Sequence, residues 1–140
     1  MEKKTENIKL LLDNEHGRIE LSNGILIATW KATFINLDIA KNAVSSRLLV
    51  TAGQNYPVLI KIKSIKDSTK EARDFLASEK GCDGIIAGAV KVDSVLTNML
   101  ATFFIYLNKP LIPTKIFKDE TKAMQWLEQF VEKDSKMKIK

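Results

Sequence analysis

The chain has 140 residues, of which 45% are hydrophobic and 28% are charged, and its formal net charge is +5. This length fits one domain with its own core, and a single cysteine, Cys82, and a single histidine, His16, exclude an internal disulfide framework and any site built on two imidazoles of one chain. No apolar run reaches the ~18 residues of a membrane-spanning helix, and the apolar stretch near the start is too short for a signal peptide, so we expect a cytoplasmic protein without a membrane span.

The positive charge is concentrated at the end of the sequence. Residues 133–140 hold four lysines and one aspartate, and we expect them to form a frayed basic tail. The three arginines, Arg18, Arg47 and Arg73, lie in different predicted elements, so no clustered basic surface of the kind that binds nucleic acid is apparent, and we expect no nucleic-acid partner.

The first half of the sequence predicts a hairpin, a helix and a strand. Residues 18–21 alternate polar and apolar, an Asn-Gly turn signal follows, and residues 25–30 read as a second, antiparallel strand. Asn36 is placed to cap a helix that ends near Gly53, and residues 56–60 form a short apolar strand typical of a buried parallel sheet. The segment before residue 16 suits either a short helix or packing against a neighbour.

The second half alternates helices and strands. Ser68 and Glu71 match a capping box that opens a helix stopping at Gly81, and residues 84–92 read as a strand. Asp93 or Ser94 caps a helix over 95–107, residues 113–117 form a last strand, and Asp119 caps a final helix.

This order predicts an α/β fold. We expect a mixed, mostly parallel sheet of about five strands that starts with an antiparallel hairpin and is flanked by four helices. We expect an N-terminal extension over 1–16, one domain over 17–132 and the basic tail over 133–140.

The order of elements and their endings resemble the SpoIIAA-like fold of STAS domains and of STAS/SEC14-type small bacterial proteins. The most specific part is the C-terminal run, in which a strand ends at Phe117, an acidic cap follows, and a helix carries Ala123, Trp126 and Leu127. The resemblance spans roughly residues 17–130 and implies a regulatory module that acts through other proteins.

The resemblance also implies a regulatory site. In STAS antagonists of anti-sigma factors, a Ser or Thr in an Asp-Ser-Ser-Gly-like motif accepts phosphate. Here the corresponding positions are Asp67, Ser68 and Thr69, with Lys70 in place of the glycine. A phosphate at a helix start would be stabilised by the helix dipole and by nearby lysines at 61, 63, 66 and 70, whereas helix capping alone also accounts for Ser68 and Glu71.

The predicted helix over 95–107 is apolar almost all round. We expect one stripe to pack on the sheet, namely Leu96, Leu100, Phe103, Phe104 and Leu107. The residues that would then need another cover are Val95, Met99, Ile105 and Tyr106. We favour a homodimer interface there over the alternative, a small apolar or lipid-like ligand between this helix and the sheet.

Catalytic patterns are not evident. His16 is expected to face solvent, Cys82 has no histidine nearby in the sequence, and neither metal-ligand spacing nor a phosphate-binding loop is present, so we expect no cofactor and no metal. The sequence therefore predicts a non-enzymatic STAS-like protein-interaction module whose protein partner is unknown.

Overall fold

The computed structural model describes residues 8–139 and the side chains as far as Val131. The first half contains β1 (Ile8–Asp13), β2 (Gly17–Ser22), β3 (Ile25–Trp30), β4 (Phe34–Ile35), α1 (Leu37–Thr51) and β5 (Tyr56–Lys61). The second half contains β6 (Asp67–Ser68), α2 (Lys70–Ala77), β7 (Ile85–Lys91), α3 (Val95–Phe103), the π-helical turn η2 (Phe104–Asn108), β8 (Thr114–Phe117) and α4 (Glu120–Ile139).

Six strands form one mixed sheet in the order β1-β2-β3-β5-β7-β8. β1, β2 and β3 pair antiparallel, and β3, β5, β7 and β8 run parallel. The predicted α/β order and the antiparallel hairpin at the start are therefore confirmed. β4 and β6 form a separate small parallel pair.

The sixth strand is β1, which the sequence did not resolve. The segment before residue 16 was expected to be a short helix or a packing segment, but Ile8–Asp13 pairs with β2 along the edge of the sheet. Leu11 and Leu12 reach the cluster around Leu26, so the strand buries part of its apolar surface.

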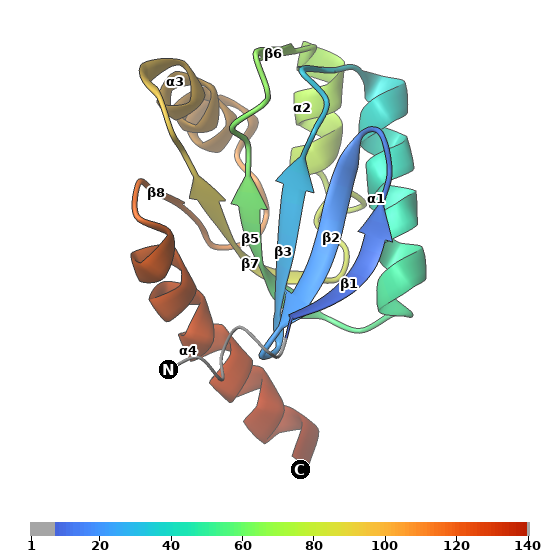
Figure 1. Cartoon of the computed structure of the whole chain (residues 1–140), viewed down its shortest axis with the longest axis vertical. Coiled ribbons are helices and arrows are strands. Elements are labelled where there is room, and N and C mark those ends of the chain that lie inside the picture. Colours follow the sequence, from blue (N-terminus) through green and yellow to red (C-terminus); the bar gives the residue numbers. More distant parts are fainter. Residues whose placement is uncertain (1–7, 140) are drawn as a thin grey trace.

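Helices cover both faces of the sheet (Figure 1). Alternate residues of a strand point to opposite faces, so Ile25, Leu59 and Ala89 meet α4 on one face. Their neighbours Leu26 and Val58 point to the other face, where α1 and α2 lie. The backbone of α4 runs close to β5 and β7, whereas α1 and α2 run close to each other and stand off from the strands.

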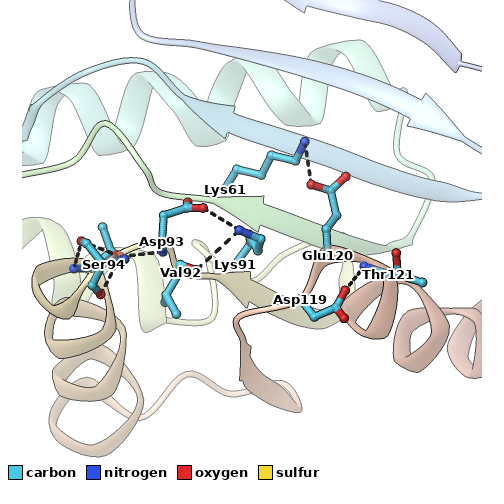
Figure 2. A network of polar contacts seen from close by, with 9 residues as sticks. Lys61, Lys91, Val92, Asp93, Ser94, Asp119, Glu120 and Thr121 are labelled. Atoms are coloured by element: carbon cyan, nitrogen blue, oxygen red, sulfur yellow. Dashed lines mark hydrogen bonds and ion pairs between the residues drawn. The ribbon is translucent and has the colours of Figure 1, made fainter.

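Polar contacts fix where α4 begins. Asp119 Oδ1 accepts a hydrogen bond from Thr121 N at 2.8 Å, as the predicted cap requires, and Glu120 pairs with Lys61 of β5 at 3.2 Å (Figure 2). Leu127 is fully buried against the sheet, and the ring of the neighbouring Trp126 contacts the rings of Phe117 and Phe130, at centroid distances of 5.7 and 4.9 Å. The helix continues to Ile139, beyond the start of the predicted tail.

Within the described residues, no helix combines the length and the apolar character needed to cross a membrane.

Three of the four predicted helix caps are confirmed. Asn36 caps α1, Ser94 caps α3 and Asp119 caps α4. The cap predicted at Ser68 is wrong, because Thr69 is the residue whose hydroxyl accepts from Ala72 N, at 3.1 Å. Ser68 belongs to β6 and pairs with Ile35, so its backbone is already committed to a strand.

The cap assignment makes a stability prediction. Thr69→Ala should lower the free energy of unfolding by about 1 kcal/mol, because the first turn of α2 loses its side-chain acceptor. Urea denaturation followed by circular dichroism measures this. Ser68→Ala is the matched control, and an equal or larger loss there would show that the cap lies at Ser68 after all.

Candidate functional site

A cavity of about 220 Å³ lies between the sheet and the helices α1, α2 and α3. Its floor is formed by residues of β3, β5 and β7, among them Ala28, Ile60 and Gly88. Its roof is formed by α1 and α2, and Leu100, Ala101 and Phe104 close it on the side of α3 and η2. The exposed residues Asn14 and Asn42 also belong to its wall, so the cavity reaches the surface.

The space exists because small residues stand where large ones would fill it. Gly88 lies in the middle of β7, and a Cβ built there would be 3.4 Å from Ile60 Cδ1 and 3.6 Å from Ile112 Cδ1, which is ordinary van der Waals contact. Ala40 and Ala72 let α1 and α2 pack closely on each other and on Ile35. The two helices thus bury their smallest residues against one another and stand off from the strands beneath.

One charged side chain in the wall of the cavity is buried. Arg47 of α1 is only 7% exposed, and its guanidinium donates to the carbonyl oxygens of Asp83 at 2.6 Å and Gly81 at 2.9 Å. Burial lowers the pKa of Arg47 from its ordinary value, and the charge of Asp83 offsets part of that effect. These contacts tie α1 to the loop before β7.

The predicted regulatory residues lie together at the entrance to α2. Asp67 accepts from the backbone N–H of Ser68 at 2.8 Å, and the hydroxyl of Ser68 lies 3.1 Å from Arg73 Nη1. Thr69 is the helix cap. Phosphorylation of Ser68 or Thr69 stays a prediction, which the intact mass of the protein isolated from its host would check.

The four lysines around this junction do not converge on it. Lys61 is paired with Glu120 on the opposite face of the sheet, and Lys70 is paired with Asp74 at 2.8 Å. Lys63 and Lys66 are exposed and form no ion pair within the described residues, so the expected group of four cations is split.

Helix α3 packs on the rest of the fold with a different face from the predicted one. Thr97 and Ala101 are the buried residues, whereas Leu96, Phe103 and Leu107 are 39%, 48% and 73% exposed. The predicted packing stripe is therefore wrong for these three residues, although Leu100 and Phe104 do point inward to the cavity.

Among the residues expected to need another cover, Val95, Met99 and Tyr106 are exposed and Ile105 is half-buried. Together with Leu96, Phe103, Leu107 and Leu111, the three exposed residues form what we call the outer α3 face. So many exposed large apolar side chains along one short stretch of chain are unusual on a monomer.

His16 and Cys82, the two residues considered for catalysis, each have a close polar neighbour. His16 lies in the cavity wall rather than in open solvent, and its Nε2 is 3.2 Å from Glu15. The thiol of Cys82 is buried, 3.7 Å from the carbonyl oxygens of Leu76 and Ala77. The described part of the chain contains no group of three or more His, Cys, Asp or Glu side chains placed to hold a metal ion.

A family model described as "Domain of unknown function (DUF7793)" matches residues 19–131, which is most of the chain and includes all the residues that line the cavity except Leu12, Asn14, His16, Gly17 and Arg18. The chain belongs to this family. None of the curated proteins matches this DUF7793 chain.

The fold of the DUF7793 chain is that of a solved structure. The crystal structure of an uncharacterized protein of the DUF3478 family with a SpoIIAA-like fold, from Shewanella loihica, superposes with a TM-score of 0.59 at 17% sequence identity. The alignment covers 83% of this chain and 98% of that one. The predicted SpoIIAA-like fold is thereby confirmed, and at this identity the likeness concerns the fold alone.

Gly88 offers a direct test of the cavity. Gly88→Ala should raise the free energy of unfolding by about 0.5–1 kcal/mol, because the new methyl group would make ordinary van der Waals contacts and glycine is unfavourable inside a strand. Thermal and urea unfolding measure this. Gly17→Ala, also in a strand, is the contrasting variant, because its Cβ would lie 2.8 Å from the carbonyl oxygen of Thr29 and should destabilise the fold. A loss of stability in Gly88→Ala would show that the space is filled.

Proposed function

We propose that this DUF7793 protein is a non-enzymatic, cytoplasmic binding protein for a small apolar ligand, held between the sheet and helices α1, α2 and α3. The observation that carries the proposal is the cavity of about 220 Å³, in whose walls Val, Ile, Leu and Ala together are the most frequent residues. The cytoplasmic location rests on the lone cysteine, Cys82, because proteins of reducing compartments seldom depend on disulfides.

The energetic cost of an empty cavity supports an occupant. Protein interiors are normally close-packed, and apolar surface that stays in contact with water forgoes about 25 cal/mol per Å² that burial would contribute. A ligand that covers the apolar part of the cavity wall would gain this contribution.

The volume also limits the ligand. A cavity of about 150 Å³ lined by apolar side chains holds benzene, so the larger cavity here fits a ligand of about ten non-hydrogen atoms, such as a medium-length alkyl chain or a substituted ring. A full phospholipid with two long chains does not fit.

The surroundings of the two candidate catalytic groups favour binding over catalysis. A cysteine nucleophile needs a basic partner, yet the hydrogen-bond acceptors of the Cys82 thiol are two carbonyl oxygens. The partner of His16 is the exposed Glu15 at the rim. Neither contact would remove the proton from a nucleophile and so activate it.

Two neighbouring serines of α1 test the binding function. Ser46 belongs to the cavity wall and Ser45 is exposed, so Ser46→Phe should fill the cavity while Ser45→Phe should not. We expect the wild-type chain and Ser45→Phe to bind octan-1-ol equally in isothermal titration calorimetry, and Ser46→Phe to bind it about ten-fold more weakly or not at all. Absence of binding in the wild-type chain, or equal binding by both variants with native circular dichroism, would contradict the proposal.

A second candidate function, a protein-interaction module that is itself a homodimer, is favoured by the outer α3 face. Val95 and Leu107 are 85% and 73% exposed, which is costly for apolar side chains that water alone covers. The STAS-type regulatory role implied by the resemblance belongs to this candidate, with Ser68 and Thr69 as the acceptors it would use.

The homodimer is tested on α3 itself. Phe103→Glu should convert a dimer to a monomer, because it places a charge in the centre of the outer α3 face, whereas Asn98→Glu adds the same charge at an exposed polar position of the same helix and should leave the dimer intact. Light scattering over a range of concentrations measures the mass. A wild-type chain that stays monomeric at high concentration would exclude the homodimer.

A further inference from the structure

All three arginines of the sequence line the cavity. Arg18 comes from β2, Arg47 from α1 and Arg73 from α2, so residues far apart in the sequence bring their cationic side chains to one place. The sequence has many more lysines than arginines, yet no lysine among the described residues belongs to the cavity wall. Nor does any described Asp or Glu.

The three arginines differ in what already balances their charge. Arg18 is ion-paired with Asp13 at 3.4 Å and is largely exposed. Arg73 donates to the carbonyl and the hydroxyl oxygens of Ser68, at 2.7 and 3.1 Å. Arg47 is the most buried of the three, and both of its acceptors are neutral carbonyl oxygens.

Arg47 therefore holds a buried positive charge with no carboxylate of the described residues within ion-pair distance. A guanidinium carries five N–H donors, and the hydrogen bonds to Gly81 and Asp83 use two of them. The charge of Asp83 offsets only part of the cost of burying this guanidinium, and an anion arriving in the cavity would offset more of it and find donors still free.

We infer that the ligand is an apolar molecule with one carboxylate group, and that Arg47 pairs with this carboxylate while the apolar part occupies the space over Gly88 and Ile60. The inference rests on the proposed binding function and adds the chemical class of the ligand. A carboxylate fits better than a phosphate monoester, because a planar, singly charged group matches both the fork of a guanidinium and the single positive charge of Arg47.

The test compares octanoate with octan-1-ol, which differ in charge and little in shape. By isothermal titration calorimetry at low salt and neutral pH, the wild-type chain should bind octanoate about ten-fold or more tightly than octan-1-ol, since hydrogen bonds to a charged group contribute that much. Arg47→Met should bring the two affinities within about two-fold of each other. Lys41→Met removes the same charge from the exposed side of α1 and should keep the preference.

Each other result contradicts a definite part of the inference. Equal affinities in the wild-type chain would overturn the anionic ligand and leave the apolar binding function standing, whereas failure of both compounds to bind would overturn the two together. A preference that survives in Arg47→Met but disappears in Arg73→Met would overturn the placement at Arg47. If Arg47→Met does not fold, Arg47→Lys replaces it and should weaken octanoate binding while octan-1-ol binding is unchanged.

Discussion

The separation between the sheet and the helices α1 and α2 is the feature on which the rest of the molecule depends. On one face, the fully buried Ala89 and Ala123 let α4 approach the strands until no space remains. On the other face, α1 and α2 satisfy their packing by contacting each other through Ala40 and Ala72. Two layers held apart in this way leave a hollow whose volume is set by the residues beneath, and a glycine at position 88 supplies no side chain to fill it.

Helix α3 connects the two candidate functions. Its inner side, with Leu100 and Ala101, closes the cavity, and its outer side, with Met99 and Phe103, is the exposed apolar face. The helix continues into the π-helical turn η2. Asn108 of this turn donates a hydrogen bond to Asp74 of α2 at 2.6 Å. A substitution on either side of α3 can therefore shift the whole helix, which is why the binding test uses α1 and the dimer test uses a control on α3 itself.

Local sequence signals predicted most of the fold. Short polar side chains ahead of apolar runs located three helix starts, and alternation located the hairpin, because those rules act within a few residues. These rules failed where two neighbouring residues can both cap a helix, and where the spacing of apolar residues does not distinguish one face or one element from another. Ser68 and Thr69 are both good caps, and pairing with β4 decided between them. The α3 segment is apolar almost all round, so the spacing of its apolar residues does not indicate which face is buried. The edge strand β1 is too short to separate strand from helix by periodicity.

The cavity could not be predicted, because its size depends on the distance between layers rather than on any motif, but its chemistry left a trace in the sequence. Arginine is outnumbered by lysine, and the scatter of its three positions argued against a nucleic-acid surface. The same scatter has another explanation once the fold is known, since β2, α1 and α2 surround one hollow. Lysine serves on a surface, where its strongly hydrated charge keeps the chain soluble, whereas a guanidinium loses less on leaving water and offers a fixed fork of donors. In a lysine-rich chain, the presence of all three arginines in the wall of one cavity fits recognition of an anion there.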